Sequence, residues 1–275
     1  MDCALQSRKP GADSRTRKLD LDLSIIVPAW NEEWCIYHTL TVLMGHFRGA
    51  SYEVLVVDDG SRDGTAAEVR RWSRDNPEVA VRCLCLGAQR GKGGAVKAGA
   101  LASSGSWVAY IDADLDIPAD NLLRLYELAQ EGEQDVLAGS KRQLTWGRRG
   151  VPLGRKLVSV GFSDLVQLLF RLPVRDTQTG IKLFRGSWLR KAAAEARVDG
   201  FLFDLELLAM ASQDGLKMRE VCVSYTPQRE ANRIGLRKIA ACVVELARIK
   251  AALRHRGHTL HGLTREVRSY ADIDA

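Results

Sequence analysis

The chain has 275 residues, of which 46% are hydrophobic and 27% charged, a balance typical of a soluble globular protein. No apolar run approaches the roughly 18 residues that cross a bilayer, and residues 1–20 lack the apolar core of a signal peptide, which argues against export. Six cysteines without a CxxC pair indicate reduced thiols in a cytosol. We expect one large cytoplasmic domain, residues 21–233, between a disordered tail (1–20) and a basic helix with its own tail (234–275).

The net charge of +6 is unevenly distributed along the chain. Between Lys141 and Lys156 there are six basic residues and no acidic residue. Such a segment attracts phosphate, nucleic acid or an acidic membrane surface. Aromatic residues are scarce beside the basic segments and no nucleic-acid motif is present, so we expect no nucleic-acid partner.

Strand and helix patterns alternate from residue 21 to residue 139. Apolar runs predict strands at 21–28, 53–58, 79–86, 106–111 and 135–139, and helical periodicity lies between them. The first of these helices would follow Asn31, a natural N-cap residue. Strands that alternate with helices in units of about 30 residues predict an α/β fold, with a mostly parallel sheet covered by helices on both faces.

Four polar clusters, at 29–33, 58–65, 89–93 and 112–116, follow successive strands. Because the carboxyl ends of parallel strands share one edge, the clusters are expected along one rim, where open α/β sheets bind ligands. Taken singly, each has a simpler explanation: turn chemistry for Asp58 and Asp59, and a loose turn for the glycines after Arg90. The glycines after Arg90 also suit a phosphate site, in which the backbone N–H groups of a helix start and a lysine hold the phosphate.

The segment Ser106–Pro118 (SWVAYIDADLDIP) is a buried strand followed by Asp112, Asp114 and Asp116. If the chain stays extended, these alternating side chains point the same way. Neighbouring carboxylates repel one another unless they are solvated or bridged by a divalent ion, and oxygen ligands suit Mg²⁺ or Mn²⁺. The alternative is a solvated acidic loop in which Asp116 or Asp120 caps the next helix.

Four features follow the sheet region. Residues 153–172 predict a helix with a wide apolar stripe, explained either by core packing or by docking on an anionic leaflet. Asp204 and Glu206 interrupt an apolar helix start, where a buried acid is costly unless it has a partner or a function, although Asp204 also suits an N-cap. Residues 217–226 alternate like an edge strand, and 235–256 predict a basic helix that packs on the domain or binds a membrane or partner.

Several motifs, taken in order, are more specific than any one of them: VPAWNEE (27–33), VDDGSRDGT (57–65), RGKGGAV (90–96) and DADL (112–115). This series resembles the family 2 inverting glycosyltransferases of GT-A fold. Within that family, residues 90–96 and DTQTGIKLF (176–184) are similar to the dolichyl-phosphate β-glucosyltransferase branch and its bacterial polyprenyl-phosphate relatives. The resemblance covers about residues 21–233.

The resemblance implies a site for a nucleotide sugar and a divalent metal ion. At the position of Asp116, polyprenyl-phosphate mannose synthases carry glutamine as the third metal ligand, so the extra charge leaves the donor preference open. The implied metal ligands are Asp112, Asp114 and Asp116, and the implied donor-binding residues are Pro28, Ala29, Asn31, Glu32, Asp58, Asp59, Arg90, Gly91, Lys92, Arg229 and Arg233.

The expected reaction moves a hexose, with inversion, from a nucleoside diphosphate sugar, UDP-linked by preference, to a polyprenyl phosphate at an anionic membrane surface. Asp114, Asp204 and Lys92 are the expected catalytic residues: the metal and Lys92 offset the charge of the leaving diphosphate, and Asp204 orients the acceptor or takes its proton. The alternatives are a soluble transferase with a small-molecule acceptor and a non-enzymatic nucleotide-binding module. The expected acceptor site comprises Ser140, Arg142, Arg155, Asp176, Lys182, Asp204 and Glu206.

Overall fold

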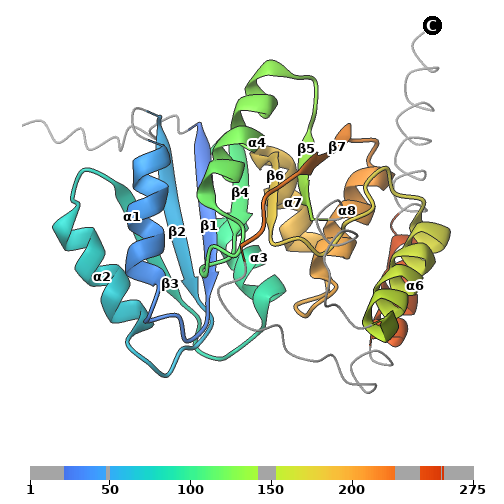
Figure 1. The fold of residues 1–275 in the computed structure, drawn as a ribbon, viewed down its shortest axis with the longest axis horizontal. Helices are drawn as coiled ribbons and strands as arrows, with labels where there is room; N and C mark the ends of the chain where they lie inside the picture. The colour runs from blue at the N-terminus through green and yellow to red at the C-terminus, as the bar shows by residue number, and fades with distance from the viewer. Residues whose placement is uncertain (1–21, 48–49, 142–152, 227–241, 255, 257–275) are drawn as a thin grey trace, which may run out of the picture.

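The computed structural model describes residues 22–47, 50–141, 153–226, 242–254 and 256. A seven-stranded sheet in the order β3-β2-β1-β4-β6-β5-β7 forms its centre (Figure 1). The strands are β1 (Leu23–Ala29), β2 (Tyr52–Asp58), β3 (Ala80–Cys85), β4 (Trp107–Ile111), β5 (Val136–Ser140), β6 (Ile181–Arg185) and β7 (Met218–Cys222).

The sheet is mostly parallel, as predicted. Strands β1 to β4 are parallel to one another. Strand β6 runs antiparallel between β4 and β5, and β7 pairs in parallel with β5 at the edge. The edge strand predicted within 217–226 is therefore confirmed. Strand β6 was not predicted, because the buried Lys182 interrupts its short apolar run.

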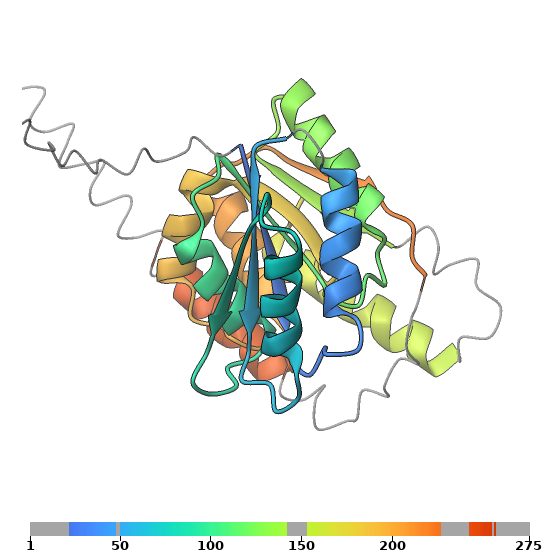
Figure 2. The same ribbon diagram turned by 90° about the vertical axis from the view of Figure 1, so that its left-hand side faces the viewer.

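Helices cover both faces of the sheet. Alternate β1 side chains separate two cores: Ile25 and Val27 pack with residues of α1 and α4, whereas Ile26 packs with residues of α3 and α8. Figure 2 shows α1 (blue) and α4 (green) on one side of the sheet, with α7 and α8 (orange) on the other. The helices are α1 (Ile36–His46), α2 (Thr65–Asp75), α3 (Lys92–Ala102), α4 (Ala119–Glu131), α6 (Leu153–Phe170), α7 (Gly186–Glu195) and α8 (Phe203–Gln213), and residues 242–254 are also helical.

The N-cap predicted at Asn31 is wrong. Helix α1 begins at Ile36, and Cys35 before it makes no side-chain capping bond. Asn31 instead has a φ of 55°, and its Oδ1 accepts the N–H of Arg62 at 2.9 Å. Its side chain therefore connects the loop after β1 to the loop after β2.

Some predictions fall on residues that the structure does not describe. These are the tail at 1–20, the basic loop at 142–152, and residues 227–241 with Arg229 and Arg233. Within the described ranges, none of the helices has both the length and the apolar character needed to span a bilayer.

Candidate active site

The predicted rim is formed by the loops that follow β1, β2, β3 and β4. These four strands are neighbours in the order β3-β2-β1-β4 and all run the same way, so their carboxyl ends meet at one edge. Pro28, Ala29, Asp58 and Asp112 stand at or directly after three of these ends. The structure thus brings together residues predicted for the donor and for the metal.

The first two loops are held together by hydrogen bonds. The backbone N–H of Asn31 donates to Ser61 Oγ at 2.9 Å, and that of Glu32 donates to Thr65 Oγ1 at 2.9 Å. Asp58, itself buried, accepts the N–H of Ser61 at 2.9 Å. These contacts fix the backbone of 28–32 against that of 58–65. Between them the indole of Trp30 is 48% exposed, an aromatic surface on the rim that the sequence analysis did not select.

Asp59 holds the loop after β3. Its carboxylate is buried and accepts the N–H groups of Arg90 at 2.7 Å and Gly91 at 2.8 Å. Gly91 has a φ of 91°, a conformation that favours glycine. Asp59 therefore fixes the turn at Arg90 and Gly91, and in doing so it also positions this loop at the rim.

The glycines after Arg90 do not form an open phosphate cradle. A Cβ at Gly93 would lie 2.5 Å from Phe203 Cβ, and one at Gly91 would lie 2.8 Å from the carbonyl oxygen of Asp199. That oxygen also accepts the N–H of Gly94 at 3.3 Å. The glycines are thus explained by close packing of residues 199–203 on the start of α3, and this use of the motif was missed because the partner lies about a hundred residues away.

The acidic segment after β4 is not extended. The N–H of Leu115 donates to the carbonyl oxygen of Asp112 at 3.3 Å, and Leu115 has a φ of 50°. The expectation that three alternating side chains share one side of an extended chain is therefore wrong. Capping of α4 by an aspartate is also absent, since Pro118 holds the N-cap position and no side chain caps it.

Asp112 and Asp114 nevertheless remain half-exposed at the rim. Asp112 Oδ1 forms an ion pair with Lys92 Nζ. Burial, together with the charges of Asp112 and Asp116, raises the pKa of Asp114. The carboxylate of Asp114 is thus destabilised in its ionised form, as expected where a cation completes the site.

The charge and chemistry of these residues fit a divalent ion. Half-exposed carboxylates at a strand end provide hard oxygen ligands. In the described ranges, however, no three His, Cys, Asp or Glu side chains gather as a metal centre would require. Asp112 and Asp114 are the best-placed ligands, and donor phosphates commonly complete such a coordination sphere.

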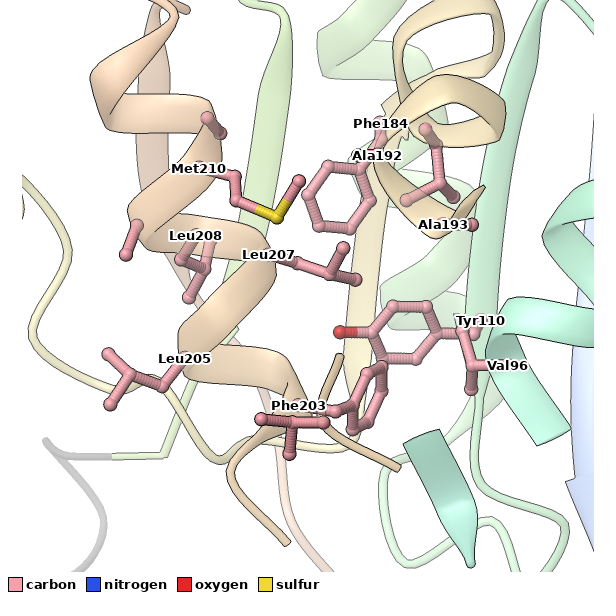
Figure 3. Close-up of a cluster of buried hydrophobic side chains, with 14 of the residues drawn as sticks. Val96, Tyr110, Phe184, Ala192, Ala193, Phe203, Leu205, Leu207, Leu208 and Met210 are labelled. Carbon is pink, nitrogen blue, oxygen red and sulfur yellow. The ribbon is translucent and has the colours of Figure 1, made fainter. Parts of the chain in front are cut away.

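A buried polar network lies directly beneath the rim. Asp204, near the start of α8, accepts at Oδ1 from Lys182 Nζ at 2.6 Å and from the Tyr110 hydroxyl. Lys182 is fully buried and also donates to the carbonyl oxygen of Thr179 at 2.7 Å. Figure 3 shows the Tyr110 hydroxyl pointing toward α8 beside Phe203. Tyr110 was not predicted as a site residue, although a hydroxyl within an apolar strand signals a buried partner.

Burial controls the ionisation of this network. It raises the pKa of Tyr110 well above the usual range, with a further contribution from the Asp204 charge. It also lowers the pKa of Lys182, an effect that Asp204 opposes. For Lys92, burial favours the neutral form, but Asp112, Asp204 and Asp114 outweigh it and raise the pKa. Lys92 and these three acids therefore form one electrostatic group.

The other residues predicted for the acceptor have structural contacts. Asp176 Oδ2 accepts the N–H of Lys141 at 2.9 Å and the hydroxyl of Thr179 at 2.6 Å. The buried Glu206 accepts the N–H of Val198 at 2.8 Å, which holds the connection between α7 and α8. These bonds explain both acids without an acceptor. Ser140 is buried in β5, Arg142 is not described, and of Arg155 only the helical backbone is.

Comparison with known proteins places this rim in a family. Residues 24–193 match the Glycosyl transferase family 2 domain, so the chain belongs to glycosyltransferase family 2, whose members are sugar-transferring enzymes. It is 36% identical over 219 residues to the dolichyl-phosphate β-glucosyltransferase of Drosophila melanogaster, covering 75% of this chain and 67% of that protein. The corresponding enzyme of Dictyostelium discoideum is 31% identical, with 74% and 66% covered. The chain thus spans about two thirds of the length of these relatives.

A solved structure supports the fold assignment. Glucosyl-3-phosphoglycerate synthase from Mycobacterium tuberculosis, in complex with Mn²⁺, UDP and glucosyl-3-phosphoglycerate, superimposes with a TM-score of 0.61 at 21% identity, covering 86% of this chain and 80% of that one. The predicted GT-A fold is therefore confirmed.

Proposed function

We propose that this chain transfers a hexose, with inversion, from a UDP-linked donor to the phosphate of a polyprenyl phosphate, with Mg²⁺ or Mn²⁺ as cofactor. The observation that carries the proposal is the meeting of Lys92 with Asp112 and Asp114 at the end of β4, beside the two loops tied together by Asn31. The similarity to dolichyl-phosphate β-glucosyltransferases supports the choice of acceptor and sugar.

The chain's own residues would divide the chemistry as follows. A divalent ion, held by Asp112 and Asp114 with Asp116 nearby, would supply the charge that offsets the departing diphosphate. Lys92 would add a second positive charge. Loop 28–32 and the loop after β2 would hold the nucleoside, and Arg229 with Arg233 would reach the diphosphate.

Asp204 has a different task in this proposal. Its Oδ1 already accepts hydrogen bonds from Lys182 and from the Tyr110 hydroxyl, and both of these side chains are buried. An acceptor phosphate is largely ionised at neutral pH, so its attack requires no strong general base. Asp204 would therefore act as a fixed negative charge beneath Lys92, orienting the cations above it.

The acceptor's lipid would approach over α6 and the helical residues 242–254. Between them lies a groove of about 350 Å³ lined by apolar side chains and by Lys250 and Arg254. Leu168 and Val244 are exposed on the same two segments. Apolar side chains flanked by basic ones suit the peripheral contact with an anionic cytoplasmic leaflet that we propose.

The test is a panel of donors and acceptors. The protein would be assayed with labelled UDP-glucose, other UDP-sugars and GDP-mannose, each with polyprenyl phosphate, polyprenol or phosphoglycerate, and with Mn²⁺ or Mg²⁺. We expect labelled product in the organic phase with a UDP-sugar and polyprenyl phosphate. Transfer to phosphoglycerate alone would replace the lipid acceptor by a small molecule, and transfer from GDP-mannose alone would overturn the donor assignment.

A further inference from the structure

Lys92 already occupies the cation position of the proposed metal site. It is the first residue of α3, and its ammonium pairs with Asp112 Oδ1. Asp112 is thus not a vacant ligand, because one of its two oxygens carries a positive partner.

The second oxygen of Asp112 is confined on another side. Gly180, directly before β6, lies so close that a Cβ there would stand 1.8 Å from Asp112 Oδ2. The carboxylate is therefore held between the backbone of residue 180 and the ammonium of Lys92. A divalent ion at Oδ1 would compete with Lys92, because the two cations repel each other at the same oxygen.

We propose that Lys92 is a resident cation. Its ammonium holds Asp112 until the divalent ion binds, and Lys92 then moves from Asp112 to the donor diphosphate. This inference rests on the proposed function. The flexible four-carbon stem of lysine allows the movement. Metal and donor binding would then be coupled through one side chain, which exchanges a carboxylate for a phosphate.

If Lys92 competes with the metal ion for Asp112, removing its positive charge should increase the affinity of the site for the ion. Lys92→Met should bind Mn²⁺ about three to ten times more tightly than wild type in the absence of nucleotide, the range expected for losing one competing, partly exposed ion pair. Lys92→Arg, which keeps the charge, should stay close to wild type. Lys217→Met is the matched control, because Lys217 precedes β7 at the opposite edge of the sheet, where it pairs with Glu133 at 2.7 Å.

The measurement is Mn²⁺ titration of the full chain followed by electron paramagnetic resonance, without and with UDP. UDP should tighten Mn²⁺ binding more in wild type than in Lys92→Met, since only wild type gains a new lysine–phosphate contact. Circular dichroism would check folding, and Lys92→Gln would replace the Met variant if that variant failed to fold.

The outcomes separate the two proposals. In the first outcome, wild type binds Mn²⁺, Asp114→Asn does not, and Lys92→Met binds Mn²⁺ no more tightly than wild type. That result would overturn the resident-cation role and leave the proposed function standing. Wild type that binds no Mn²⁺ with or without UDP would overturn the metal site itself, and the present inference with it.

Discussion

Gly180 is the position where one methyl group perturbs the proposed site most directly. A Cβ there would lie 1.8 Å from Asp112 Oδ2, whereas real Cβ atoms essentially never come within 3.0 Å of such a neighbour. In Gly180→Ala the carboxylate must therefore move by about 1 Å or more, and a misplacement of that size costs roughly 100-fold in rate. We expect kcat/KM to fall about 100-fold, equivalent to about 2.7 kcal/mol of transition-state stabilisation.

The fold should tolerate this substitution better than the reaction does. Asp112 is half-exposed, so its side chain can rotate into solvent with little loss of packing. Gly45→Ala in α1 is the matched control, because a Cβ there has nothing within 4 Å. That variant should keep full activity and gain about 0.5–1 kcal/mol of stability from helix propensity.

The assay combines sugar-transfer kinetics with thermal unfolding of both alanine variants. A Gly180→Ala enzyme that keeps kcat/KM within about threefold of wild type would refute the reasoning, since it would mean that the position of Asp112 does not matter to the transition state. A large fall in melting temperature with normal kcat/KM at low temperature would refute it equally, by assigning Gly180 a purely structural role.

Three further predictions address the acids and the basic loop. Asp114→Asn should abolish turnover yet raise the melting temperature at pH 7, because the pKa of Asp114 is raised in the folded state and its ionised form therefore opposes folding. The gain should disappear as pH falls through that pKa, so a pH-independent gain would contradict the argument. Lys182→Met should lower the free energy of unfolding by about 3–5 kcal/mol in urea titrations, because it leaves a buried carboxylate without its cation, and adding Asp204→Asn should recover part of the loss. Neutralising Arg142 and Arg155 should raise the acceptor KM about tenfold, as expected for lost charge-assisted phosphate contacts, with donor affinity unchanged; flat acceptor kinetics would assign both residues to another role.

The sheet and its rim could be predicted because their signals are local. Each of β1, β2 and β4 is a compact apolar run followed at once by polar residues. Because parallel strands end at the same edge of the sheet, these polar residues are expected to lie close together. Helix starts were less predictable: Asn31 has the chemistry of an N-cap but is used between two loops. The turn after Asp112 was also missed, because nothing in the sequence indicates that Leu115 has a φ of 50°.

Long-range packing explains the remaining differences. The glycines at 91–94 have the composition of a phosphate-binding turn, and only the close approach of Asp199 and Phe203 reveals their packing role. Glu206 was predicted to face an acceptor because a buried acid is costly without a partner or a function, and Asp176 because its motif resembles that of the family. Their partners are backbone N–H groups, which no residue pattern displays.

Asp204 shows how an expectation from local sequence can depend on a distant partner. Its apolar surroundings indicated a functional acid, and β6 supplies Lys182 from 22 residues upstream. Because Lys182 is buried in the core while Lys92 is partly exposed, the two lysines would divide the work: Lys182 stays paired with Asp204, and Lys92 exchanges partners as proposed above. A single lysine could not do both, since binding the diphosphate would leave a buried carboxylate unpaired at a cost of several kcal/mol. In the proposed exchange, the buried pair would therefore allow Lys92 to leave Asp112 when a metal ion binds.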